Sequence, residues 1–291
     1  MTQTAVAPPD ATSAARPEMR EAGRLTYVLR QHFRYTYDTP VRDLNHRLVV
    51  IPPRQHGDQR RLSHSVAVSA DGARTRRRAD AAGNAVFWCR VPQVPDHVEF
   101  VVEAVVERVC PGSDPILPAG TLTDPRLLRP TRLTAPDPAI RELAATMAGR
   151  DPLTTAERFC THVHETISYA HGATSVATTA AQALAGRRGV CQDAAHVMIA
   201  LCRTAGLPAR YVSGHLIGEG GTHAWVEVVI ADAAGARAVP FDPCNGRRGS
   251  MDYLTIATGR DYADIAPTSG TYIGSARGTL TAAKQVSISM D

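Results

Sequence analysis

Lysine is almost absent from this sequence, and two other features are missing as well. Lys284 is the only lysine, so arginine supplies nearly all of the positive charge. No apolar run approaches the roughly 18 residues that a membrane-spanning helix needs. The first 23 residues have neither the basic start nor the apolar centre of a secretory signal. These absences argue against a membrane protein and lead us to expect a cytoplasmic location.

The six cysteines form no C-x-x-C pair and no regular framework. A structural zinc site normally draws on closely paired cysteines, and a disulfide-stapled fold needs a repeated cysteine spacing. The histidines also lack a consistent metal-ligand spacing. We therefore expect no metal and no other cofactor, and free thiols suit a reducing compartment.

The net charge of +4 is mild, and the strongest basic cluster comprises Arg74 and residues 76–78. It lies between two strand-like runs, where an exposed hairpin edge often carries charge. No aromatic residues are interleaved with it, as binding of single-stranded nucleic acid would favour. We interpret it as a solvated edge and expect no nucleic-acid partner. The oligomeric state stays open.

The chain of 291 residues is long enough for one large domain or two ordinary ones. Short strand-like runs dominate residues 25–110, helical patterns follow a proline-rich connection, and strands return from residue 209. Strands and helices in separate blocks are typical of an α+β protein. The expected divisions are a disordered tail (1–24), an N-terminal β-sandwich-like domain (25–115), a surface linker (116–135), a mixed core (136–270) and a C-terminal strand segment (271–291).

Four segments show helical spacing of apolar residues. The second has Asp151 as its expected N-cap and Pro152 at its first helical position. The fourth carries its apolar face on residues such as Val197 and Leu201, and it ends at Gly206. The four helices are expected at residues 137–149, 151–169, 178–186 and 191–205.

Cys191 directly follows Gly-Val and opens the fourth of these helices. A thiol at that place meets the positive end of the helix dipole, which favours the thiolate form. This position suggests a nucleophile rather than a buried structural thiol. Asp193, two residues later, should point away from the thiol and stabilise the first turn of the helix.

A predicted β-hairpin supplies two further groups. His223 begins the strand "HAWVEVVI", and Asp242 ends the strand "RAVPFD". With the turn centred between Asp232 and Ala233, His223 lies directly opposite Asp242, about 5 Å away at Cβ. A one-residue change of register would place the two side chains on opposite faces. In this arrangement His223 takes the thiol proton and Asp242 holds the imidazole.

The residues around these three groups resemble the transglutaminase-like core, a relative of the papain-type fold. The matching stretches are "GVCQDAAHVMIALCRTAGLPARYVSG", "THAWVEV" and "PFDP", in the family's order. The likeness extends to "RYTYDTPV" and "ADAAGN", as in bacterial relatives with a β-rich N-terminal region. It implies a helix bundle packed on an antiparallel sheet, with Cys191, His223 and Asp242 as the catalytic residues.

Two departures from the family pattern concern the same site. Only Trp88 and Trp225 are present, and neither stands upstream of Cys191 where the family has a tryptophan that stabilises the oxyanion. The backbone N–H of Cys191 is one candidate oxyanion donor, with Gln192 and Tyr169 as candidates for the other. Cys244 occupies the place of a threonine.

We expect a cysteine enzyme that transfers the acyl group of an amide or peptide substrate through a thioester. Water as the acceptor makes it an amidase or peptidase, and this outcome is favoured because the sequence shows neither an acidic amine-binding cleft nor a calcium loop. An amine acceptor would make it a transglutaminase or amide synthase. A peptide-binding scaffold without activity is the third alternative.

Overall fold

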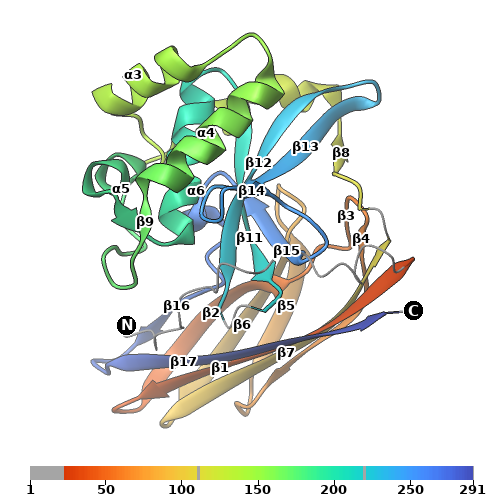
Figure 1. The fold of residues 1–291 in the computed structure, drawn as a ribbon. Helices are drawn as coiled ribbons and strands as arrows, with labels where there is room; N and C mark the ends of the chain where they lie inside the picture. Colours follow the sequence, from red (N-terminus) through yellow and green to blue (C-terminus); the bar gives the residue numbers. More distant parts are fainter. Residues whose placement is uncertain (1–22, 110–111, 219–220, 291) are drawn as a thin grey trace.

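The computed structural model describes residues 23–109, 112–218 and 221–290. Nearly all of the expected N-terminal tail therefore lies outside the described residues. Within them the chain forms three antiparallel sheets and a layer of helices, which covers one of the sheets (Figure 1). This confirms the predicted α+β class. No helix in the described ranges has both the length and the apolarity needed to cross a bilayer.

Two of the sheets form a sandwich at the N-terminal end of the chain. The first sheet has the strand order β17-β1-β7-β4-β3, and the second has the order β16-β2-β6-β5. Alternate residues of β1, such as Leu25, Tyr27 and Leu29, are buried, as the period of a half-covered strand requires. The strands are β1 (Arg24–Tyr37), β2 (Val41–Ile51), β3 (Gln55–His56), β4 (Gln59–Val68), β5 (Arg74–Ala79), β6 (Ala85–Val94), β7 (His97–Val109), β16 (Thr268–Ile273) and β17 (Gly278–Met290).

The last two strands return to this sandwich from the far end of the sequence. β17 pairs along the whole of β1, and β16 pairs with β2. β16 begins at Thr268, within the range that the sequence analysis gave to the core. The N-terminal and C-terminal segments therefore build one sandwich together.

The basic cluster lies on β5, the edge strand of the second sheet. All six residues of this strand are exposed, and its only partner among the described strands is β6. Arg77 contacts the ring nitrogen of His64 on β4 at 3.0 Å and lies over the ring of Phe87. The interpretation as an exposed hairpin edge agrees with this geometry.

The third sheet forms the core domain together with four helices. Its order is β14-β13-β12-β11-β15, and β8 pairs with β13. The strands are β8 (Ile116–Leu117), β11 (Ala209–Leu216), β12 (His223–Asp232), β13 (Gly235–Asp242), β14 (Arg247–Arg248) and β15 (Tyr253–Gly259). The main helices are α3 (Pro138–Met147), α4 (Pro152–Thr166), α5 (Ala180–Gly186) and α6 (Cys191–Thr204). The smaller elements are η1 (Ala119–Thr123), α2 (Pro125–Leu128), β9 (Ser168–Tyr169), β10 (Arg188–Gly189) and η2 (Tyr262–Asp264).

The helices begin where their capping residues predict. The Asp151 carboxylate accepts the Thr154 N–H at 2.8 Å, so the expected N-cap of α4 is confirmed. Thr179 and Gln182 form a reciprocal capping box at the start of α5. These caps satisfy backbone donors that have no partner within the helix.

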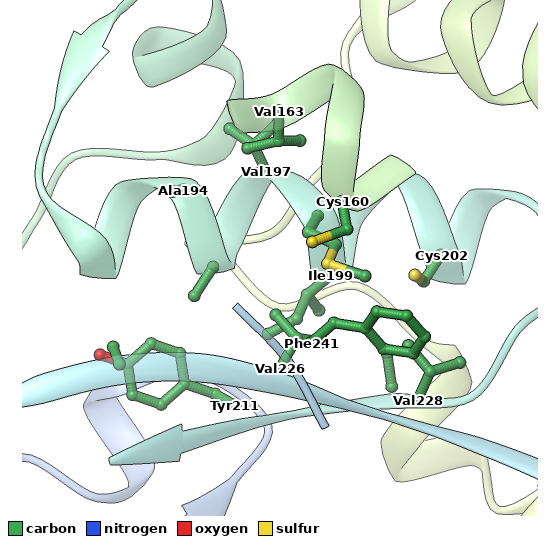
Figure 2. Close-up of a cluster of buried hydrophobic side chains, with 14 of the residues drawn as sticks. Cys160, Val163, Ala194, Val197, Ile199, Cys202, Tyr211, Val226, Val228 and Phe241 are labelled. Atoms are coloured by element: carbon green, nitrogen blue, oxygen red, sulfur yellow. The ribbon is translucent and has the colours of Figure 1, made fainter. Parts of the chain in front are cut away.

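Helix α6 lies at the centre of the core domain rather than on its surface. The sequence predicts one apolar face, but every residue from Gln192 to Arg203 is buried. Figure 2 shows the reason: Val226, Val228 and Phe241 pack from the sheet below, and Cys160 approaches from α4. Because neighbouring elements pack against α6 from several sides, all of its faces are buried rather than one.

The sequence suggested that the proline-rich connection runs over the surface, but in the structure part of it is buried. Leu133 and Thr134 are buried, and the guanidinium of Arg203 on α6 donates to Thr134 Oγ1 at 2.9 Å. The same guanidinium donates to the backbone oxygens of Leu127, Ala209 and Arg260. A single buried arginine thus fixes the connection against the core.

Two side-chain amides of the sandwich cover the outer edge of the core sheet. Gln59 accepts the Thr255 N–H at 2.9 Å and donates to the Thr255 carbonyl at 2.8 Å. Asn84 makes the same pair of bonds with Thr258, both at 2.8 Å. These amides satisfy backbone groups of the edge strand β15 that another strand would otherwise pair.

Candidate functional site

Cys191 is the first residue of α6, as the sequence predicts. Its side chain is half-buried. Residues in the first turn of a helix have backbone N–H groups without intrahelical acceptors, and the helix dipole is positive there. The thiol therefore lies where a developing negative charge is stabilised.

Asp193 fixes the chain that leads into Cys191. Its Oδ2 atom accepts the Val190 N–H at 2.8 Å and the Thr174 hydroxyl at 2.6 Å. This supports the expected stabilising role in the first turn. The carboxyl also fills the space beside Gly189, where an added Cβ would lie 2.7 Å from Asp193 Cβ. The Gly-Val-Cys-x-Asp sequence is thus one packed unit.

The Asp193 carboxyl is buried, and no cationic side chain of the described residues forms an ion pair with it. Burial raises its pKa, although the bonds from Thr174 and Val190 oppose that shift. The second oxygen, Oδ1, is buried and has no hydrogen-bond partner. Both observations disfavour the charged form of Asp193 relative to an exposed aspartate.

The hairpin of β12 and β13 joins His223 to Asp242. His223 Nε2 lies 2.7 Å from Asp242 Oδ2, and both side chains are buried. The predicted partnership is therefore present, but the predicted register is wrong. Asp232 pairs with Gly235 and Val226 with Phe241, a displacement of two residues.

The reason for the displacement is the hairpin turn. The two-residue loop is Ala233-Ala234, and the Asp232 carboxylate accepts the Ala234 N–H at 3.0 Å. A displacement of two residues keeps each side chain on its face of the sheet. His223 and Asp242 are therefore diagonal neighbours on one face instead of direct opposites.

Asp242 accepts an unusually complete set of hydrogen bonds. Oδ2 also accepts the Tyr253 hydroxyl at 2.6 Å and the Asn245 amide at 2.7 Å. Oδ1 accepts the backbone N–H groups of Cys244 and Asn245. Burial alone would raise the pKa of Asp242, but His223 and these donors lower it to about 2. The carboxylate is therefore ionised and rigidly held.

Tyr253 and Asn245 are site residues that the sequence analysis missed. Tyr253 begins β15, a strand for which no prediction was made, although Thr255, Ile256 and Thr258 are typical of a strand. Asn245 follows Asp242 by three residues, a spacing typical of a turn closed by an aspartate side chain. Either signal would have pointed to the surroundings of Asp242.

The helix that begins at Cys191 packs against the strands that lead to His223. Ala224, the neighbour of His223, belongs to the hydrophobic cluster against which Cys191 packs. Burial raises the pKa of Tyr211 on β11, and negative charge at Cys191 adds to that rise. The thiol, the imidazole and the carboxylate thus come from the α6–β11–β12–β13 region of one domain.

The two candidate oxyanion donors occupy different surroundings. Gln192 is the second residue of α6 and is almost fully buried. Tyr169 is 40% exposed on β9, whose partner strand β10 ends at Gly189, two residues before Cys191. No contact among the described residues favours Gln192 over Tyr169 as the oxyanion donor, so both stay predictions.

Three further thiols and His215 in the described part of the core domain differ in their surroundings. Cys202 is fully buried, and burial raises the pKa of Cys160 to about 12. Cys244 is half-buried. His215 is buried beside Lys284, whose Nζ lies 2.8 Å from His215 Nδ1. Across the described ranges, no group of three or more His, Cys, Asp or Glu side chains has the geometry to hold a metal ion.

Sequence comparison places this geometry in a known family. Residues 141–243 match the profile of the Transglutaminase-like superfamily. The core of this chain is a transglutaminase-like core. Residues 27–107 match the bacterial transglutaminase-like N-terminal region, so the two predicted parts of the resemblance are confirmed. The superfamily match supports a cysteine-based enzyme in general.

Two mycobacterial proteins resemble this chain, one over much of its length and the other over a shorter part. An uncharacterised protein of Mycobacterium tuberculosis is 29% identical over 251 residues, which cover 76% of this chain and 79% of the relative. An uncharacterised Mycobacterium leprae protein is 36% identical over 118 residues, covering 37% of this chain and 40% of its own length.

Among solved structures, a candidate cysteine protease from Cytophaga hutchinsonii superposes with a TM-score of 0.69 at 22% identity. The match covers 92% of this chain and 91% of that one. It shows that the sandwich and the core occur together in another protein, and it confirms the predicted fold.

Proposed function

We propose that this protein is a cysteine-nucleophile acyl-transfer enzyme that cleaves an amide or peptide bond, with water as the final acceptor. The observation that carries the proposal is the buried His223–Asp242 pair on the hairpin beside the helix that begins with Cys191. Because Nε2 of His223 points to Asp242, Nδ1 is the ring nitrogen that would take the thiol proton.

In the first half of the reaction, His223 accepts the thiol proton and the Cys191 sulfur attacks the substrate carbonyl carbon. The C–N bond then breaks as the imidazolium returns its proton to the leaving amine, which leaves a thioester. In the second half, His223 takes a proton from water, and the resulting hydroxide attacks the thioester. The C–S bond breaks as the imidazolium returns its proton to the sulfur, and the acid is released.

Asp242 holds the imidazole through both halves. An ionised carboxylate on Nε2 fixes the tautomer and stabilises the imidazolium that forms twice in the cycle. The four other donors around Asp242 keep that carboxylate in place. The Cys191 N–H, with Gln192 or Tyr169, would donate hydrogen bonds to the negatively charged oxygen of the tetrahedral intermediate.

Site-resolved alkylation tests the proposal without knowledge of the substrate. Iodoacetamide is applied between pH 5 and 8, and labelling at each cysteine is measured by peptide mass spectrometry. Cys191 should label rapidly near pH 5–6 and slowly after His223→Ala, because the imidazole is then absent. Cys244, the other half-buried thiol described, is the control in the same sample. Slow labelling of Cys191 that rises only near pH 8.5 would indicate the scaffold alternative.

Turnover is tested by trapping the acyl-enzyme from a peptide library and weighing the intact protein. Cys191→Ala should keep the fold and abolish the mass increase, whereas Cys244→Ala should keep both. Cys191→Ser should be nearly inactive because a hydroxyl ionises far less readily than a thiol. Turnover that survives Cys191→Ala would contradict the mechanism.

The amine-transfer alternative is separated by the chase that releases the trapped acyl group. Release in water alone indicates hydrolysis, and release only with added amine indicates a transglutaminase or amide synthase. The single lysine, Lys284, lies against buried His215. The low number of lysines is compatible with both outcomes. It does not exclude amine transfer, because an enzyme that used amines would then have few amines of its own to modify.

A further inference from the structure

A polar groove lies beside the start of α6. Its volume is about 750 Å³, and it is formed by the 171–178 loop, the helix α5 and Arg188 of β10. Arg188 precedes Cys191 by three residues, and three extended residues span at most about 11 Å. At Arg188 the groove therefore comes within about 11 Å of the proposed nucleophile along the backbone.

The lining of this groove presents hydrogen-bond donors. The Gln182 oxygen accepts the Thr179 N–H at 3.0 Å, which leaves the Gln182 NH₂ group as the end available to a ligand. The Ser175 and Thr178 oxygens accept backbone N–H groups of Ala177 and Ser175, so the two hydroxyl hydrogens are available to donate elsewhere.

Arg188 supplies the charge of the lining. His171 also lines the groove, and none of its ten lining residues is Asp or Glu. Within the described parts of the chain, no ion pair of Arg188 closer than 4 Å is present. An exposed guanidinium that has no carboxylate partner, surrounded by hydroxyl and amide donors, suits a planar oxyanion.

The groove is also connected mechanically to the proposed nucleophile. Thr174 lies in the lining loop, and its hydroxyl donates to Asp193, which holds the backbone just before Cys191. A ligand that orders this loop would therefore act on the same hydrogen-bonded unit that positions the thiol.

We propose that this groove recognises a carboxylate of an acidic peptide substrate, with Arg188 as its principal partner. This inference rests on the proposed function, since it assigns the class of acyl donor to that site. The acidic side chain of the peptide lies in the groove, and the scissile amide a short distance along the peptide lies at Cys191.

Peptide binding to the Cys191→Ala protein tests the inference apart from turnover. Two pools of fluorescein-labelled hexapeptides are compared by anisotropy; they differ only in Asp and Glu being replaced by Asn and Gln. The acidic pool should bind about tenfold more tightly, and added salt should weaken this pool alone. Arg188→Gln should remove the preference. His171→Gln should reduce it.

Arg141→Gln is the matched control, because it removes the same charge from an exposed position on α3. It should leave the preference unchanged. Equal binding of the two pools, no measurable binding of either, or an equal loss in both arginine variants would overturn the inference. A failure of the proposed function would show instead as turnover that survives Cys191→Ala, whatever the peptide binding.

Discussion

Asp242 and Asp193 are both buried in the core domain, and their surroundings shift their pKa values in opposite directions. Asp242 meets His223 and four further donors, which hold its pKa at about 2 although burial opposes this. Among the described residues Asp193 meets two donors and no cation, so burial raises its pKa, and one of its oxygens has no described hydrogen-bond partner. The depth of burial alone therefore does not determine charge; the number and charge of the donors do.

In the proposed mechanism the two carboxyl groups have separate tasks. An ionised Asp242 would hold the imidazolium, and its oxygens accept from five donors. Asp193 accepts the Val190 N–H in either protonation state, and its raised pKa reduces the negative charge that it would place near the start of α6. Four substitutions test this comparison.

The largest effect is expected from Asp242→Asn. The NH₂ group of the new amide would face donors that now bond to the carboxylate, and it cannot accept from them. We therefore expect kcat/KM to fall by about 10³–10⁴-fold. The sign of the pH effect follows from the lowered pKa. The native carboxylate stabilises the fold above about pH 4, and this contribution is lost as the pH falls toward 2.

The stability deficit of the variant should therefore be larger at pH 7 than at pH 3, measured by urea unfolding. Asp252→Asn is the control, since Asp252 is also buried and ion-paired, with Arg247. It should cost stability but leave kcat near normal. Equal activity losses in both variants would contradict a special role for Asp242.

Gly189→Ala should produce the next largest effect. The added Cβ would lie 2.7 Å from the Asp193 side chain and must displace it. We expect a loss of about 1–3 kcal/mol in unfolding free energy and a fall in kcat of tenfold or more. Gly120→Ala, where no atom lies within 4 Å, should change neither quantity.

Tyr253→Phe removes one of the five bonds to Asp242 and leaves the ring in place. A hydrogen bond to a charged group contributes about 1.5–3 kcal/mol, so a moderate loss of stability is expected. The fall in kcat/KM should be roughly tenfold, smaller than that of Asp242→Asn. Tyr272→Phe removes a hydroxyl bonded to Ala276 in the sandwich and should not change activity.

Asp193→Asn should have the smallest effect. The amide oxygen still accepts from Val190 and Thr174, and the NH₂ group takes the place of the oxygen that lacks a partner. The pKa of Asp193 is higher in the folded protein than in the unfolded chain. Asp193 therefore stabilises the fold at pH values below its ordinary pKa, and this contribution is lost as the pH rises through the folded pKa. Relative to the native protein, the variant should gain stability from pH 4 to pH 7, the opposite of Asp242→Asn.

Thr174→Val and Thr174→Ser separate the hydrogen bond from the loop packing. Valine removes the donor to Asp193, whereas serine keeps it. A rise in KM for valine that serine reverses would support the link between the groove and the helix start.

A large loss of stability in Asp193→Asn at pH 7 would show that Asp193 is ionised in the native protein, which would break the comparison.

The sequence predicts local features of this site well because they depend on neighbours in the chain. The start of α6 at Cys191 and the Asp151 cap follow from residues within one helical turn. The face shared by His223 and Asp242 follows from the period of two in a strand. The prediction survived a wrong register only because the error was an even number of residues.

What the sequence could not supply are contacts between distant segments. The Ala-Ala loop has no residue that fixes its own position, so the register depended on Asp232 and on the strands around it. Tyr253 reaches Asp242 from β15, a strand that pairs with β11 and is separated from β13 by two strands of the folded sheet. The buried surroundings of α6 likewise depend on packing that no single helix pattern contains.

The amides of Gln59 and Asn84 have a practical consequence for anyone who cuts this protein into modules. They substitute for a missing neighbour strand, so an excised core would present bare peptide groups along β15 and tend to self-associate there. The sandwich is therefore more than an appendage to the core: the smallest unit worth expressing, grafting or crystallising includes both.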